Sequence, residues 1–141
     1  MEEYFVTYEQ ALRLKELGFD RKCHYHYDTT AYKPAICPNY TANDGEGGGQ
    51  WIYADDCNLY EDMNHCQYCS APTLAQAQRW LREKKNLQPE PQYLSKDKWL
   101  CVIKFLPDGA WVMVNNEQEY FSSYEDALSV GITKAINLLS E

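Results

Sequence analysis

The chain lacks the long apolar run that a membrane span requires. Nowhere do its 141 residues approach the ~20 consecutive apolar residues needed to cross a bilayer. The opening residues, Met1 to Tyr4, also lack the basic and apolar regions of a secretory signal. We therefore expect neither membrane insertion nor export, and we predict a cytoplasmic protein with reduced cysteines.

Basic residues are scarce. The chain has 13 Lys and Arg against 21 Asp and Glu, a formal net charge of −8. Nucleic-acid affinity comes largely from neutralising phosphates, so this balance argues against a nucleic-acid partner. Between residues 20 and 70 there are three basic and eight acidic residues, a balance of 3 − 8 = −5. A basic partner surface could use this acidity, although such an excess also serves solubility.

Catalytic motifs are missing as well. The glycines at 45 and 47–49 lack the lysine and the following Ser or Thr of a phosphate-binding loop. No nucleophile and base stand at a spacing that would mark a hydrolase or a transferase. The sequence therefore favours a function other than catalysis, without excluding an enzyme.

Three helix starts are clearly marked. Thr7, Thr73 and Ser123 each precede, by three positions, an acidic or amide side chain that can complete a helix N-cap. The predicted helices cover residues 8–17, 74–85 and 124–139. The last carries an apolar stripe that includes Ile132 and Ile136, and it needs a sheet to lie on.

The strands are predicted mainly in the C-terminal half. Residues 98–106 and 110–114 flank the turn Pro107-Asp108-Gly109, which indicates a hairpin. Residues 119–121 are expected to add a third strand, and the prolines in 88–91 suggest an extended connector. Short strands are also expected at residues 23–27 and 50–54. We therefore predict an α+β fold in a single domain, 1–141, with three helices on a small antiparallel sheet and a C-terminal β-β-β-α unit.

A metal site is conceivable in the central segment, which we define as residues 20–70. Cys66 and Cys69 have the spacing of one half of a zinc site, and His65 and Cys57 lie close to them in the sequence. The second half is missing at standard spacing, although Cys23 or another histidine could complete the set. The alternative is that these cysteines are ordinary buried or loop thiols. Zinc is thus possible, and no other cofactor is indicated.

The central segment is also rich in tyrosine. Seven of the chain's twelve tyrosines lie there, together with a tryptophan. Tyrosine is common at binding surfaces because it offers a large rigid area with a polar tip. The candidate partner-binding residues are Tyr25, Tyr27, Tyr32, Trp51, Tyr53 and Tyr60. The alternative is that same-face pairs such as Tyr25 and Tyr27 only pack on neighbouring strands.

Three strings carry a resemblance to a known family. The first is Thr7 to Asp20, and the second runs from Cys69-Ser70-Ala71-Pro72-Thr73 through Trp80-Leu81-Arg82-Glu83. The third is Tyr124 to Leu128 with Gly131-Ile132. They resemble a family of small uncharacterised proteins of Bacteroidetes and of their phages and mobile elements. The resemblance implies a protein of the bacterial cytoplasm, or of the host cytoplasm if phage-encoded, and it transfers no activity to any residue.

Two hypotheses follow. The first is a small non-catalytic binding or accessory module that recognises a protein or a small ligand through its aromatic and acidic central segment. The second is a zinc-stabilised structural protein in which that segment has no recognition role. Neither hypothesis involves nucleic acid or a membrane.

Overall fold

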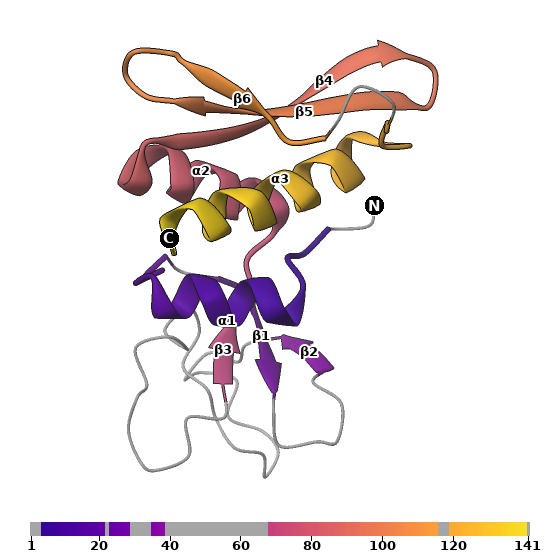
Figure 1. The fold of residues 1–141 in the computed structure, drawn as a ribbon. Coiled ribbons are helices and arrows are strands. Elements are labelled where there is room, and N and C mark those ends of the chain that lie inside the picture. The colour runs from indigo at the N-terminus through magenta and orange to yellow at the C-terminus, as the bar shows by residue number, and fades with distance from the viewer. Residues whose placement is uncertain (1–3, 22, 29–34, 39–67, 116–118, 141) are drawn as a thin grey trace, which may run out of the picture. The chain divides into compact units, whose positions relative to one another are not determined.

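The computed structural model describes residues 4–21, 23–28, 35–38, 68–115 and 119–140. They form three helices and two three-stranded antiparallel sheets (Figure 1). The chain is arranged as two compact units, an N-terminal unit, Phe5–Pro72, and a C-terminal unit, Met1–Tyr4 with Thr73–Glu141. The α+β class is thus confirmed, whereas the expectation of one sheet is corrected to two. The assignment to a single domain stays a prediction.

The N-terminal unit contains one helix and a small sheet. Helix α1, Tyr8–Glu16, packs against strand β3. Strand β1, Tyr25–Asp28, lies between β2, Ala35–Pro38, and β3, Tyr68–Ser70. The predicted strand at 23–27 is confirmed as β1, whereas residues 50–54 lie outside the described residues. The sequence did not indicate β2 and β3, because three or four residues are too few to show a clear alternation.

The start of α1 has the predicted capping chemistry. The Thr7 hydroxyl accepts a hydrogen bond from the Gln10 backbone N–H at 3.1 Å, and the Thr7 N–H donates to the Gln10 side-chain oxygen at 2.8 Å. The helix ends at Glu16, and Gly18 follows with a positive φ of 96°. A capping box and a left-handed stop are interactions among neighbouring residues, which is why the sequence alone located this helix.

Replacing Thr7 by alanine should lower the free energy of unfolding by about 1 kcal/mol, because the exposed side chain contributes a cap rather than core packing. Thr7→Ser is the matched control, since it keeps the hydroxyl. Urea denaturation followed by circular dichroism measures both variants. Equal losses in Thr7→Ala and Thr7→Ser would show that the hydroxyl does not stabilise the helix.

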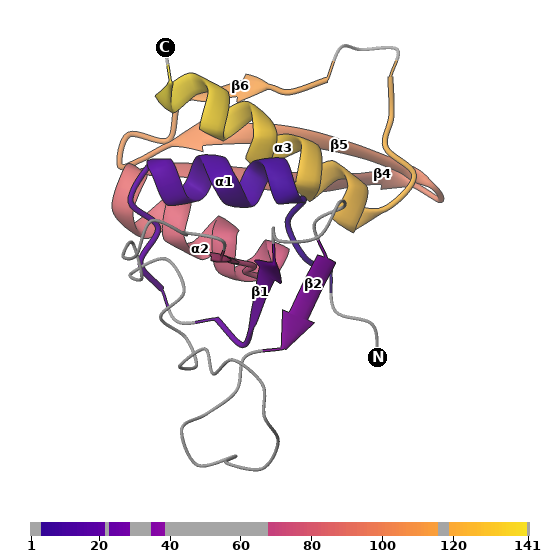
Figure 2. The ribbon, with the colours of Figure 1, turned by 90° about the horizontal axis from the view of Figure 1, so that it is seen from below.

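The C-terminal unit is built from two helices and a hairpin-rich sheet. Its elements are α2, Leu74–Lys85; β4, Leu87–Ser95; β5, Lys98–Phe105; β6, Trp111–Met113; and α3, Tyr124–Leu139. The strand order is β4-β5-β6, and α2 and α3 lie on the same face of this sheet (Figures 1 and 2). The predicted helices and the hairpin of β5 and β6 are confirmed, and the C-terminal helix follows strands as predicted.

Strand β4 corrects the prediction of a connector at 88–91. It is an edge strand, in which Pro89 pairs with Ile103 and Pro91 with Cys101. The Pro89 carbonyl accepts a hydrogen bond of 2.6 Å from the Gln78 side chain of α2, so the backbone at this position points away from β5. Because an antiparallel residue directs its nitrogen and its carbonyl to the same side, a proline here removes no bond from the ladder.

The third predicted strand, 119–121, is reduced to one isolated bridge between Phe121 and Trp99. The backbones of these two residues exchange hydrogen bonds of 2.8 and 2.9 Å. The buried Asn115 side chain extends the contact between β5 and its partners, because its oxygen accepts the Cys101 N–H at 3.2 Å. Its amide nitrogen donates to the Glu119 carbonyl. A side chain thus supplies the pairing that a longer third strand would have given.

The core of the C-terminal unit lies between α3 and the sheet. The predicted stripe is buried at Ala127, Leu128, Gly131, Ile132, Ala135 and Ile136. At Gly131 the helix backbone comes so close to the sheet that an added Cβ would lie 2.5 Å from the Cys101 Sγ and 3.1 Å from the Pro89 Cβ. Cys101 and Pro89 therefore face α3, and their strand neighbours Val102 and Glu90 face the other way.

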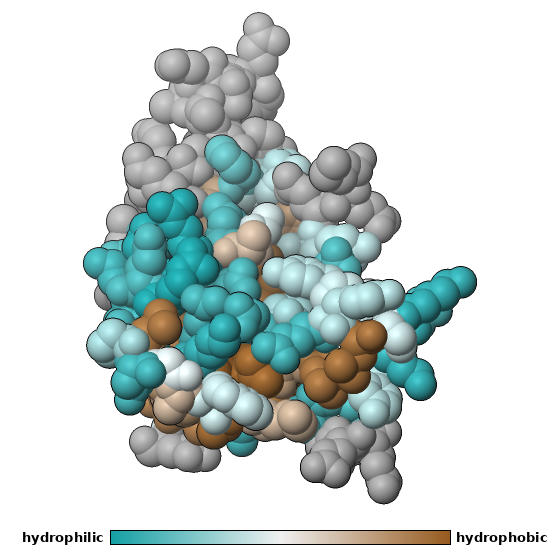
Figure 3. All heavy atoms as spheres, turned by 90° about the horizontal axis from the view of Figure 1, so that it is seen from above, coloured by the Kyte–Doolittle hydropathy of each residue, from teal (hydrophilic) through white to brown (hydrophobic). Residues whose placement is uncertain are grey.

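The opposite face of this sheet is partly apolar. Trp111 and Met113 lie on it, since they pair with Lys104 and Val102, and their exposed fractions are 58% and 38%. Lys104 bridges to Glu90 at 2.7 Å beside them. Figure 3 shows hydrophobic side chains scattered among hydrophilic ones on this side. Single exposed apolar residues of this kind are common on small domains.

Candidate functional site

Two of the predicted binding residues lie on β1, on one face of the strand. The Tyr25 ring packs edge-on against Phe5, with ring centres 5.0 Å apart, and the Tyr27 ring packs edge-on against Tyr8 at 5.5 Å. The Tyr27 hydroxyl donates a hydrogen bond of 2.6 Å to the Val6 carbonyl. Burial raises the pKa of Tyr27, and the nearby Cys69 adds to the rise. Both tyrosines thus have packing roles, and their role in binding stays a prediction.

The other predicted partner-binding residues lie outside the described residues; they are Tyr32, Trp51, Tyr53 and Tyr60. Three of the predicted zinc ligands, Cys57, His65 and Cys66, also lie outside them. Cys69 is buried on β3, opposite Tyr27 in the register with β1. Within the described ranges, no group of three or more His, Cys, Asp or Glu side chains could hold a metal ion. The zinc hypothesis therefore stays a prediction.

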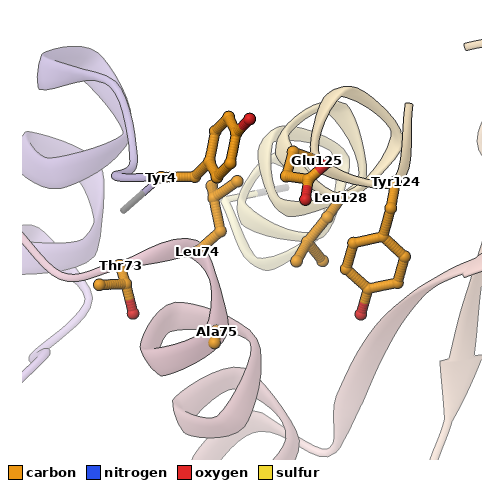
Figure 4. A pocket seen from close by; sticks show the side chains of 7 residues that line it. All are labelled: Tyr4, Thr73, Leu74, Ala75, Tyr124, Glu125 and Leu128. Atoms are coloured by element: carbon orange, nitrogen blue, oxygen red, sulfur yellow. The ribbon is translucent and has the colours of Figure 1, made fainter. Parts of the chain in front are cut away.

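A pocket of about 300 Å³ lies in the C-terminal unit, where two helices begin close to the N-terminal residue Tyr4. We call it the Tyr4–Tyr124 pocket. It is lined by Tyr4, Thr73, Leu74, Ala75, Tyr124, Glu125 and Leu128 (Figure 4). In this view Tyr4 lies above Leu74 on one side of Glu125 and Leu128, and Tyr124 lies on the other side. A cavity of this size is at the lower end of the range of small-ligand sites.

Local backbone chemistry fixes the walls of the pocket. The Leu74 N–H donates to the Tyr4 carbonyl at 2.9 Å, which holds the backbone of Tyr4 at the start of α2. Thr73 forms a full capping box with Gln76, at 3.1 and 2.8 Å. Ser123 accepts from the Asp126 N–H at 3.1 Å and so begins α3, although the reciprocal bond of a capping box is absent there. Two of the three helix starts that the sequence marked, those at Thr73 and Ser123, thus lie at one pocket.

An aromatic row continues from the pocket. The Tyr124 ring packs edge-on against Trp99, with ring centres 5.6 Å apart, and Trp99 packs edge-on against Tyr93 at 5.2 Å. Trp99 is fixed by its bridge to Phe121. Tyr93 and Tyr124 have exposed fractions of 62% and 40%. The row holds the Tyr124 ring in place and extends the aromatic surface beyond the pocket.

The lining has the composition of a binding site. Leu74, Ala75 and Leu128 supply apolar surface, and the tyrosines and Glu125 supply a few polar groups. The carboxylate of the half-buried Glu125 makes no hydrogen bond or ion pair with any other residue that the structure describes. The seven lining residues include no histidine, cysteine or lysine, and their polar side chains are three hydroxyls and the Glu125 carboxylate.

Sequence reasoning missed this pocket. It marked Thr73 and Ser123 as helix caps, and it had no signal that the two helix starts and Tyr4 would meet. Nothing in the spacing of Tyr4, Tyr124 and Glu125 distinguishes them from surface residues, because their proximity depends on how α2 and α3 pack.

No protein-family model matches this chain, and neither a curated protein nor a solved structure matches it. None of the helices in the described part of the chain has the length and apolar character to cross a membrane.

Proposed function

We propose that this protein is a small non-catalytic binding module of a bacterium or a phage, which recognises a protein or a small ligand. The Tyr4–Tyr124 pocket is its recognition site in the C-terminal unit. The tyrosine-rich and acidic central segment, residues 20–70, provides a second recognition surface in this proposal.

The observation that carries the proposal is the pocket itself. It combines about 300 Å³ of space with apolar lining residues and two tyrosine residues, Tyr4 and Tyr124, that are 49% and 40% exposed. Largely apolar cavities with a few convergent polar groups are typical of ligand sites. Tyrosines contribute strongly to binding because a rigid ring loses little entropy on contact.

The composition of the lining favours binding over catalysis. Its polar groups are three hydroxyls and one carboxylate, which can position a ligand by hydrogen bonds, and the lining has none of the His, Cys or Lys side chains that often act as catalytic base or nucleophile. The net charge of −8 argues against nucleic acid as the partner.

A fragment screen by two-dimensional NMR tests the proposal. Fragments that bind should shift the amide signals of Ala75, Glu125 and Leu128, and Tyr124→Ala should raise their Kd by about tenfold, as expected when a central aromatic contact is lost. Val130→Ala is the matched control, because Val130 lies on the same helix, is 43% exposed and does not line the pocket. Its Kd should stay within about twofold of the wild-type value.

Two results would contradict the proposal. One is a screen in which no fragment shifts the amides of the pocket. The other is an equal loss of affinity in Tyr124→Ala and Val130→Ala, which would show that the lining tyrosine does not contact the ligand.

A further inference from the structure

We infer that the Tyr4–Tyr124 pocket binds a cationic side chain, and specifically an arginine in a basic segment of a partner protein. This inference rests on the proposed function and assigns the ligand class of the same site. It follows from the charge, the aromatic rings and the size of the pocket.

The negative charge of the pocket favours a cationic ligand. Glu125 is half-buried in the lining, and its carboxylate has neither an ion pair nor a hydrogen bond in the described part of the chain. A carboxylate in such a position gains most from a partner that brings both positive charge and N–H donors. An arginine guanidinium supplies both and can bind the two oxygens at once.

The aromatic rings of the pocket also favour a cation. A cation binds over a tyrosine face when it lies within about 6 Å of the ring centre. The C-terminal unit already uses this interaction, with Lys85 over Trp80 and Lys98 over Tyr120, each at 5.5 Å. Tyr4 and Tyr124 offer two further rings at the pocket, and a planar guanidinium stacks on such rings better than an ammonium.

The apolar lining and the volume of the pocket suit a long basic side chain. Leu74, Ala75 and Leu128 form an apolar surface that suits the methylene stem of a long basic side chain. The volume of about 300 Å³ suits a single side chain rather than a large cofactor. The pocket is therefore matched to a group that is apolar along its stem and positive at its tip.

An anionic ligand is the competing possibility, because two helices begin at the pocket. Each helix start carries only about half a positive charge. Against them stand the full negative charges of Glu125 and Asp126 in the first turn of α3. The caps of Thr73 and Ser123 also occupy one N–H of each helix. The summed charge of the helix starts and the two carboxylates is therefore negative. The net charge of −8 on the chain would also attract a basic partner from a distance.

The test uses three short peptides, acetylated and amidated, that differ only in a central arginine, lysine or citrulline flanked by glycines. Citrulline has nearly the shape of arginine without its charge. In an NMR titration of the full chain, the arginine peptide should shift the amides of Ala75, Glu125 and Leu128 saturably. The lysine peptide should bind more weakly, and the citrulline peptide at least about tenfold more weakly than arginine.

Two variants separate the effect of the Glu125 charge in the pocket from the effect of the overall negative charge of the chain. Glu125→Gln should weaken arginine binding by about fivefold or more, and the loss for citrulline, which brings N–H donors without a charge, should be smaller. Asp108→Asn removes the same charge from the turn between β5 and β6, outside the lining, and should change arginine binding by less than about twofold.

The outcomes distinguish this inference from the proposed function. Equal binding of arginine and citrulline, or equal losses in Glu125→Gln and Asp108→Asn, would overturn the cation inference while a pocket that still binds fragments keeps the proposed function. A pocket that binds neither the peptides nor any fragment would overturn both.

Discussion

Replacing Gly131 by alanine is expected to lower the free energy of unfolding by about 2 kcal/mol, although alanine favours helices. The new Cβ would lie 2.5 Å from the Cys101 Sγ and 3.1 Å from the Pro89 Cβ. Cys101 is fully buried, and the Pro89 Cβ belongs to a ring fixed in β4, so neither contact can relax easily. Overpacking typically costs about 1–3 kcal/mol, and the 2.5 Å contact places Gly131→Ala at the upper end of this range, so about 2 kcal/mol remains after the ~1 kcal/mol gained in helix propensity.

A second substitution tests whether this contact is the cause. In Gly131→Ala with Cys101→Ala, the sulfur that makes the closest contact is gone, and the Cys101 Cβ would lie 4.0 Å from the new methyl group. We expect the double variant to recover at least about 1 kcal/mol relative to the sum of the single variants. Urea denaturation of all four proteins completes the cycle. Strict additivity would show that the close approach of α3 to Cys101 does not decide the cost.

The comparison of sequence and structure shows why some features were predictable. The caps at Thr7 and Thr73 and the left-handed stop at Asn86, with a φ of 57°, depend on residues within one helical turn. Such interactions are encoded locally, and the helix boundaries followed from them. The turn at Gly109, with a φ of 80°, located the hairpin in the same way.

The missed features depend on distant parts of the chain. Pro89 fits a strand only because β4 lies at the sheet edge and Gln78 of α2 binds its carbonyl. Gly131 looked like one more position in an apolar stripe, and only the structure shows that its lack of a side chain lets α3 approach the sheet. The Tyr4–Tyr124 pocket depends on the same packing. No local pattern could reveal these juxtapositions, whereas the proposed sites in the central segment lie mostly outside the described residues.

The stability of the C-terminal unit is expected to fall by about 2 kcal/mol as the pH rises from about 9 to about 11, through the thiol of Cys101. Burial raises the pKa of Cys101 from 9.0 to about 11; a backbone hydrogen bond with Glu90 opposes the rise, and the Glu90 charge adds to it. Between these values the unfolded thiol ionises while the folded thiol keeps its proton. The unfolded state then binds fewer protons, so the free energy of unfolding decreases with pH.

Cys101→Ala provides the control for this pH dependence. The difference in unfolding free energy between wild type and Cys101→Ala, measured in urea with a reductant, should be constant below about pH 9 and should shrink or change sign towards pH 11. Taking the difference removes other groups with raised pKa values, such as Tyr27 and Cys37, which both proteins share. Parallel curves for the two proteins up to pH 11 would show that the Cys101 thiol ionises as readily in the folded state as in the unfolded chain. The tight packing of Gly131 against this sulfur argues for the opposite result, because a thiolate there would have no room for the water that could solvate it.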